Sequence, residues 1–246
     1  MTPVRLAPSP NHNERSTDTP DILLLHYTDT FDATEALAIL RDPAAEVSAH
    51  YLVDSDGTIY ALVPEQRRAW HAGRGSWGAR GDINSRSIGI EVQNPGHRCG
   101  LAPFPDAQIE ALIGLCRRIV QRWQIPATHV LGHSDIAPTR KRDPGELFPW
   151  ARLAQAGIGV FPPDLPAPRL HLAEGMHGPV VFRMQTSLAR YGYPVPMSGR
   201  FCAETRAVVT AFCRHFNPQR LDGIWDGLCA VKLDWLHHQR VCAVQI

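Results

Sequence analysis

The stretch Asp21-Ile-Leu-Leu-Leu-His26 decides the fold, because it is a short apolar run that ends on a histidine. A run of this kind without polar alternation predicts a strand buried on both faces, as in the centre of an α/β sheet. Asp32 and Glu35 have the spacing of a capping box, and Asp42-Pro43 ends the apolar pattern that follows them. The segment therefore predicts a buried strand followed by a helix.

Two further patterns add strands to this sheet. Residues 49–53 and 58–63 flank the turn signal Asp56-Gly57, which predicts a hairpin. Residues 87–93 place isoleucine and valine on one face of a strand and glycine, glutamate and glutamine on the other. Glu91 is therefore expected on the polar face of its strand.

Helical periodicity follows these strands. Apolar side chains recur at helical spacing over residues 106–124, and Pro126 closes the pattern. The apolar pair Val130-Leu131 then leads directly to His133. Strands that alternate with helices predict an α/β fold with a mixed central sheet flanked by helices.

A second unit is expected at the C-terminal end. The stretch 161–168 holds four prolines in eight residues, which favours an extended, semi-rigid linker. Apolar patterns beyond it predict three short helices, hence a small helical domain. We expect a first domain over 1–163, a Pro-rich linker over 164–175 and the helical domain over 176–246.

Composition excludes several classes of protein. Of 246 residues, 44% are hydrophobic and 20% charged, values typical of a folded globular chain and not of a disordered or collagen-like one. Lys+Arg number 25 against 24 Asp+Glu, so no strong overall field favours nucleic acid or an anionic membrane surface. No apolar run approaches the ~18 to 20 residues that span a bilayer.

Location is an expectation from two features. Residues 1–20 are polar and contain prolines, without the apolar segment of a secretory signal. The six cysteines, which lie at positions 99, 116, 202, 213, 229 and 242, include no Cys-x-x-Cys pair, so we expect reduced thiols and no zinc ribbon. A cytoplasmic protein is expected, or a periplasmic one if a signal has been removed.

Two histidines at strand ends suggest a metal site. His26 and His133 each follow an apolar run, and strand ends at the rim of an α/β sheet are where ligands bind. Asp143 lies ten residues beyond His133 and supplies a carboxylate. Two imidazoles and one carboxylate leave a fourth position open, as in catalytic zinc sites. Histidines that are merely hydrogen-bonded fit the spacing as well.

Several separated motifs carry a family resemblance. They are His26-Tyr-Thr28, Trp70-His-Ala-Gly73, Ser87-Ile-Gly-Ile-Glu91, Gly132-His-Ser-Asp-Ile-Ala-Pro138, Arg140-Lys-Arg-Asp-Pro-Gly145 and Phe148-Pro-Trp150. In this order, across about residues 20–160, the chain resembles the zinc-dependent N-acetylmuramoyl-L-alanine amidases of the AmpD and AmiD type. That family shares its fold with phage T7-type lysozymes and peptidoglycan recognition proteins.

The resemblance implies roles for five residues. It implies one zinc ion per chain, held by His26, His133 and Asp143, with Glu91 acting in catalysis and Lys141 assisting. Amide hydrolysis fits this set, because zinc activates water, a carboxylate can transfer its proton and a cation can stabilise the oxyanion. The alternatives are a solvated strand carboxylate for Glu91 and, for Lys141, a surface basic run Arg140-Lys-Arg142.

Three residues of the glycine-rich loop 71–84 are candidates for substrate contact. They are His71, Asn84 and Trp77, since this loop borders the cleft in the enzymes that the chain resembles. Hydrogen bonds that only order the loop are the alternative for His71 and Asn84. Ser134 and Asp135 adjoin His133 in the chain and cannot converge with it on one relay, which excludes a serine hydrolase.

The region 176–240 resembles a three-helix peptidoglycan-binding domain, through strings such as Met184-Gln185, Gly192-Tyr193 and Gly199-Arg-Phe201. A module that only packs on the amidase is the alternative. The expected activity is hydrolysis of the amide between the lactyl group of N-acetylmuramic acid and L-alanine, with peptidoglycan or a muropeptide as partner. A non-hydrolytic muropeptide receptor and a phage-type lytic amidase are the other hypotheses. The sequence does not fix the oligomeric state.

Overall fold

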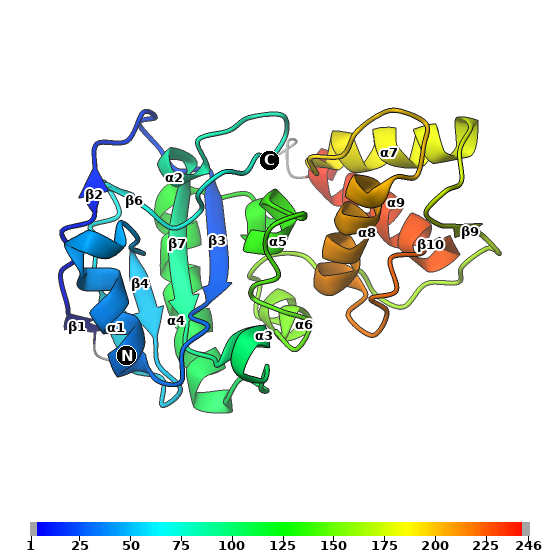
Figure 1. The fold of residues 1–246 in the computed structure, drawn as a ribbon. Coiled ribbons are helices and arrows are strands. Elements are labelled where there is room, and N and C mark those ends of the chain that lie inside the picture. The colour runs from blue at the N-terminus through cyan, green and yellow to red at the C-terminus, as the bar shows by residue number, and fades with distance from the viewer. Residues whose placement is uncertain (1–3, 243–246) are drawn as a thin grey trace.

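A six-stranded sheet forms the centre of the first half of the molecule (Figure 1). The computed structural model describes residues 4–242, without the side chains of residues 241 and 242. The strands lie in the order β1 (Val4–Leu6), β5 (Ile59–Ala61), β4 (Tyr51–Val53), β7 (Ser87–Val92), β3 (Ile22–Tyr27) and β8 (Val130–Gly132). Only the hairpin β4–β5 is antiparallel, and the other neighbours are parallel. The predicted mixed sheet is confirmed.

Strand β3 lies between β7 and β8, and the side chains of Ile22 to Leu25 are fully buried. Both faces of this strand are covered, as its unbroken apolar run predicted. On one face, Leu23 and Leu25 share a core with helix α4 (Asp106–Trp123). On the other face, Ile22 and Leu24 belong to a second core, into which the C-terminal helices also pack.

Helix α1 (Ala33–Arg41) covers strand β4, where Ala36 and Leu40 join a third small core. Its start follows the predicted capping residue, because the Asp32 carboxylate accepts a hydrogen bond from the Glu35 amide. The hairpin turn closes at Gly57, whose φ of +86° lies in the left-handed region that favours glycine. These local signals are therefore confirmed.

Short elements connect the sheet and helices. They are β2 (His12–Asn13), which pairs with β6 (Arg68–Ala69), and the helical turns η1 (Pro43–Ala45), α2 (Ile83–Arg86), α3 (Gly96–Cys99), η2 (Ala127–His129), α5 (His133–Ile136) and α6 (Trp150–Gln155). Among the helices that the structure describes, none is long and apolar enough to cross a membrane.

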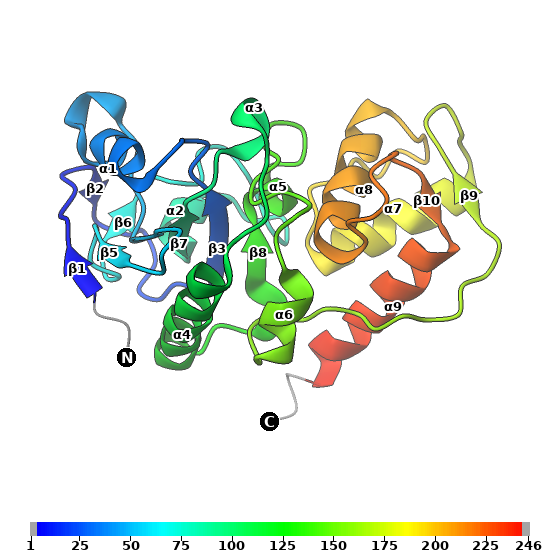
Figure 2. The same cartoon turned by 90° about the horizontal axis from the view of Figure 1, so that it is seen from below.

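Residues 171–242, which we call the C-terminal unit, form three helices and a short ribbon. The helices are α7 (Pro179–Tyr191), α8 (Ala203–Phe216) and α9 (Gly227–Cys242), and the ribbon pairs β9 (His171–Leu172) with β10 (Trp225–Asp226). The three predicted helices are confirmed. Residues 161–170 contain no helix or strand and run along the outside from α6 to β9 (Figure 2).

The C-terminal unit packs directly against the first half of the molecule. One continuous core joins Trp77 and Ile136 of the first half to Tyr191, Tyr193 and Phe212 of the C-terminal unit. Helix α8 lies beside α5 in both cartoon views (Figures 1 and 2). The predicted domain boundaries stay a prediction, but the two parts share apolar packing and not merely a linker.

Candidate active site

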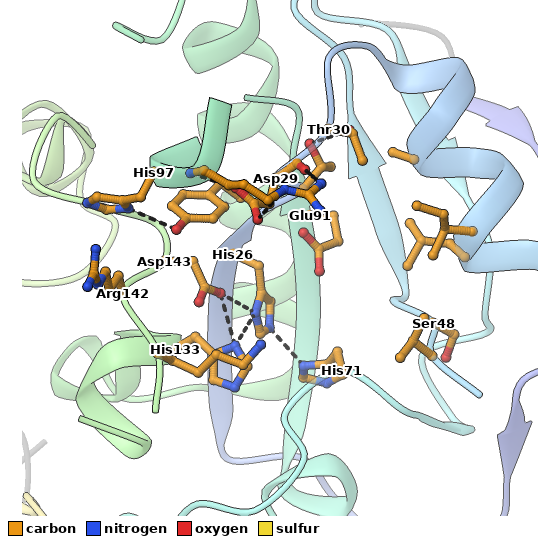
Figure 3. Close-up of a pocket in the computed structure, with 18 of the residues that line it drawn as sticks. His26, Asp29, Thr30, Ser48, His71, Glu91, His97, His133, Arg142 and Asp143 are labelled. Atoms are coloured by element: carbon orange, nitrogen blue, oxygen red, sulfur yellow. Dashed lines mark hydrogen bonds and ion pairs between the residues drawn. The ribbon is translucent and has the colours of Figure 1, made fainter. Parts of the chain in front are cut away.

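A pocket of about 530 Å³ opens at the carboxyl ends of strands β3 and β7. Its walls include the predicted residues His26, His71, Glu91, His133 and Asp143, which Figure 3 labels, and also Lys141. The sheet register explains part of this convergence, because His26 and Glu91 are partners on adjacent parallel strands. Their side chains therefore rise side by side from the floor of the pocket, a term that we use for the ends of β3 and β7.

Residues 132–146, which we call the ligand loop, bring the other two candidate ligands. Strand β8 pairs with β3 up to Gly132, so His133 emerges next to His26. The Ser134 amide donates a hydrogen bond to the Asp143 carbonyl at 3.0 Å, which ties the two ends of the loop together. The resulting geometry places two imidazoles and one carboxylate around a single point.

Three ligand atoms converge there. The Nδ1 atoms of His26 and His133 lie 3.0 Å apart, and each lies 2.9 Å from Asp143 Oδ2. A tetrahedral ion with bonds of about 2.0–2.1 Å separates its ligand atoms by about 3.3 Å, so these atoms need to part by only a few tenths of an ångström. The buried group of His26, His133 and Asp143 can therefore hold a metal ion.

The second nitrogen of each imidazole also has a partner. His133 Nε2 lies 2.8 Å from the Ala72 carbonyl, to which it donates, and this leaves Nδ1 free to bind a metal. His26 Nε2 lies 2.9 Å from His71 Nδ1, and His71 Nε2 lies 3.2 Å from Ser87 Oγ. The Ser87 hydroxyl donates to the Ile83 carbonyl, so its oxygen accepts a hydrogen bond from His71 Nε2. His71 Nδ1 then accepts from His26, which assigns the proton of His26 to Nε2.

One glycine makes room for this arrangement. A Cβ atom at Gly89 would lie 2.4 Å from His71 Nδ1, so the ring of His71 sits directly against the backbone of β7. Any larger residue at this position would displace the imidazole that supports His26. The motif Ser87-Ile-Gly-Ile-Glu91 thus serves the site at three positions: Ser87, Gly89 and Glu91.

The electrostatics of the site favour a neutral His26 and an ionised Asp143. Burial, together with the neighbouring His133, lowers the pKa of His26 to about 4. Burial opposes ionisation of Asp143, but the adjacent imidazoles of His133 and His26 outweigh it and hold its pKa well below the usual range. A metal ion needs these same protonation states in its ligands.

Glu91 has no hydrogen-bond partner for its buried Oε2 among the described residues. Its pKa is raised well above the ordinary value, first by burial and then by the Asp143 carboxylate, whereas the Lys141 ammonium opposes the rise. A half-buried carboxylate without a partner, beside a metal-binding group, is a strong candidate for proton transfer.

The three residues predicted to contact the substrate lie in different places. His71 lines the pocket. Trp77 is wrong as a pocket residue, because it is 1% exposed and its ring lies 5.0 Å from that of Tyr193 in the core between the two parts. Asn84 is also buried away from the pocket, and its Oδ1 accepts hydrogen bonds from the His71 and Ala72 amides. The loop-ordering alternative therefore holds for Asn84.

Sequence reasoning missed part of the pocket wall. Tyr27 and His97 line it, and Tyr27 Oη lies 2.8 Å from His97 Nδ1. Burial, reinforced by Asp143, raises the pKa of Tyr27 to about 12. Tyr27 follows His26 in its strand, a position that signals the pocket edge, whereas His97 reaches it through a short helical turn that leaves no periodic signal.

Comparison with known proteins agrees with this geometry. The family model described as N-acetylmuramoyl-L-alanine amidase matches residues 16–146, and one described as a putative peptidoglycan binding domain matches 177–233. The chain is 44% identical over 219 residues to the amidase AmiD of Escherichia coli, covering 82% of this chain and 76% of that protein. The chain belongs to the N-acetylmuramoyl-L-alanine amidase family.

Further proteins similar to this chain include amidases of this family. The 1,6-anhydro-N-acetylmuramyl-L-alanine amidase AmpD of Escherichia coli is 34% identical over 166 residues, which cover 60% of this chain and 88% of AmpD. The solved complex of Escherichia coli AmiD with anhydro-N-acetylmuramic acid-L-Ala-D-γ-Glu-L-Lys superposes with a TM-score of 0.77 at 36% identity, covering 89% of each chain. AmpDh3 of Pseudomonas aeruginosa, with anhydromuramic pentapeptide, gives a TM-score of 0.74 at 30% identity, covering 90% of this chain and 92% of that one.

Proposed function

We propose that this amidase uses zinc to hydrolyse the amide between the lactyl group of N-acetylmuramic acid and L-alanine in anhydromuropeptides. The observation that carries the proposal is that His26, His133 and Asp143 meet in one pocket with Glu91, whose buried Oε2 has no hydrogen-bond partner in the described part of the chain. The names of AmpD and the bound ligand of AmiD support the choice of substrate.

The donor set fits zinc. Two imidazole nitrogens and one carboxylate oxygen make an open site with three protein ligands, the pattern of catalytic zinc. When bound by His26, His133 and Asp143, zinc supplies Lewis acidity, which polarises a carbonyl and lowers the pKa of water to about 7. The hydrogen bonds of the two imidazoles to His71 and the Ala72 carbonyl hold their rings in the orientation that this requires.

Glu91 is the general base and acid in this proposal. Its raised pKa brings proton affinity closer to neutral pH, where a base is most effective and can afterwards protonate the leaving amine. Its place beside His26 on the next strand aims the carboxylate at the same space as the ligand atoms (Figure 3). Non-hydrolytic recognition would need none of these proton-transfer features.

Lys141 stabilises developing negative charge. It lines the pocket two residues before Asp143, and its backbone amide donates to the Ala137 carbonyl at 2.9 Å, which fixes the start of its side chain. A cation held near the reacting carbonyl acts as the electrostatic part of an oxyanion site. Arg140 cannot share this task fully, because its guanidinium donates to the carbonyls of Ala72 and Arg74.

Product analysis tests the proposal. Zinc-loaded enzyme is incubated with a soluble anhydromuropeptide and, separately, with intact sacculi, and the products are identified by mass. We expect free stem peptide with an N-terminal L-alanine from the soluble substrate, and none from the Glu91→Gln control. Binding without cleavage would overturn the proposal in favour of a muropeptide receptor, and release from sacculi alone would favour a lytic amidase.

A further inference from the structure

Two consecutive residues of helix α8 contact both ends of the ligand loop. His215 Nδ1 lies 2.8 Å from Asp135 Oδ2, and Arg214 Nε donates to Glu146 Oε2 at 3.2 Å. Asp135 lies two residues after His133, and Glu146 three residues after Asp143. Each of these carboxylates therefore belongs to the same turn of chain as one candidate metal ligand.

Asp135 is the better connected of the two. It is completely buried and accepts three hydrogen bonds, from the Gly132 amide, from His215 and from the Tyr193 hydroxyl, at 2.7–2.8 Å. The first of these fixes the backbone immediately before His133, and the other two come from the C-terminal unit. A buried carboxylate needs such partners, because an unpaired one is strongly unfavourable.

Packing strengthens the same contact. The His215 ring stacks on Trp150 with centroids 3.8 Å apart, and on its other side lies Phe216 at 3.9 Å. Trp150 in turn lies against Gly132, where an added Cβ would be 3.2 Å from its ring. His215 is therefore fixed in orientation: it contacts the ligand loop through its hydrogen bond to Asp135, and it stacks on Trp150, which itself lies against Gly132.

Glu146 extends the second contact to the pocket wall. Its Oε2 also lies 3.1 Å from His97 Nε2, and His97 Nδ1 contacts Tyr27, which lines the pocket. Arg214 is 8% exposed, and its partner Glu146 is partly buried. This series of side-chain contacts, from Arg214 through Glu146 to His97, thus supports the pocket next to Asp143.

We infer that the C-terminal unit positions the metal ligands of this amidase, with His215 acting on His133 through Asp135 and Arg214 acting on the Asp143 end of the loop through Glu146. The C-terminal unit then contributes to metal binding, in addition to any affinity for glycan. This inference rests on the zinc site proposed above. His215, Tyr193 and Arg214 are positioning residues, because none of them lines the pocket.

Zinc affinity of the full chain tests the inference, measured by competition with a chelator at a temperature where circular dichroism shows each variant folded. His215→Ala should weaken zinc binding about 10-fold, as loss of the partners around ligands does elsewhere. His215→Asn should restore most of it, because the asparagine amide can donate from nearly the position of Nδ1. Cobalt-substituted His215→Ala should also show an altered visible spectrum.

Two further variants separate positioning from simple stability. Tyr193→Phe removes only the hydroxyl that donates to Asp135, so it decides the question if His215→Ala does not fold. Val208→Ala, in the core of α8, is the matched control that lowers stability without removing a hydrogen bond to the ligand loop. We expect weaker zinc binding in Tyr193→Phe and unchanged zinc binding in Val208→Ala.

The outcomes are distinguishable. Unchanged zinc affinity in both His215→Ala and Tyr193→Phe, or an equal loss in Val208→Ala, would overturn the inference while leaving the zinc site intact. A wild-type chain that binds no zinc at all would instead overturn the proposed function. Addition of Arg214→Met to His215→Ala should weaken zinc binding further, since the two contacts reach opposite ends of the loop.

Discussion

The floor of the pocket and the ligand loop are held in different ways. His26 and Glu91 stand on neighbouring strands whose ladder fixes their separation, and both strands lie within the sheet. The ligand loop continues from the short strand β8 and is held at both ends by side chains of the C-terminal unit, such as His215, 80 residues from Asp135 in sequence. One half of the site is therefore encoded by strand register and the other half by tertiary contact.

The largest effect expected on the floor comes from Glu91→Gln. The amide cannot accept a proton, so the rate should fall by about 10² to 10⁴ while zinc stays bound. Steady-state kinetics on an anhydromuropeptide and metal analysis of the same sample measure both. Glu91→Asp is the matched control, since it keeps the charge and shortens the reach. An unimpaired Glu91→Gln enzyme would reassign the base.

The same substitution should stabilise the metal-free chain. Because the folded-state pKa of Glu91 lies above its ordinary value of 4.5, the folded state holds the proton more tightly than the unfolded state. The contribution of Glu91 to stability should therefore fall as pH rises through the interval between these two values. The Glu91→Gln substitution should remove that contribution, so the stability of the variant relative to the wild type should grow with pH. Thermal unfolding of the metal-free proteins from pH 4 to 8 checks it, and parallel curves for the two proteins would contradict the sign.

On the ligand loop, Lys141→Met should lower the rate by about 10², the effect of losing one group that stabilises the oxyanion. Zinc content should not change, since the lysine is not among the ligands. Arg142→Met tests the neighbouring cation, which is exposed and also lines the pocket. If zinc is lost together with Lys141, the lysine supports the loop and does not act on the substrate.

These residues also show what sequence could predict. The apolar run before His26 and the alternation around Glu91 are local signals, and both strands formed where the pattern placed them. The roles of Trp77 and Asp135 are set by Tyr193 and His215, which local patterns cannot pair with them. Trp77 was therefore wrong as a pocket residue, because its aromatic partner Tyr193 lies in the C-terminal unit.

Removal of the C-terminal unit tests how much this unit contributes to stability and to zinc binding. A chain ended after Pro163 exposes Trp77 and Ile136, and exposure of a buried apolar side chain costs about 1.5–3 kcal/mol. We expect a lower melting temperature and zinc binding weakened about 10-fold. Thermal unfolding and zinc titration measure these. A shortened chain with unchanged values would show that the sheet alone organises the site.

The last prediction concerns the redox state of two thiols in the C-terminal unit. Cys213 and Cys229 are buried with their Sγ atoms 3.5 Å apart, and the five cysteines that the structure describes are free; Cys242 lies outside the described side chains. The cytoplasmic location expected from sequence stays a prediction, and it requires these two thiols to be reduced in the native host. Thiol counting by mass after alkylation tests it, and a Cys213–Cys229 disulfide would favour an oxidising compartment.

Zinc stoichiometry of the purified chain is the most direct test of the proposed three-ligand zinc site. Native mass spectrometry of metal-free protein titrated with zinc should show one tightly bound ion in the wild type and in Glu91→Gln. His133→Ala and Asp143→Ala should show none, because each removes one of only three protein ligands. Tight binding of one zinc that survives in both ligand variants would contradict the account.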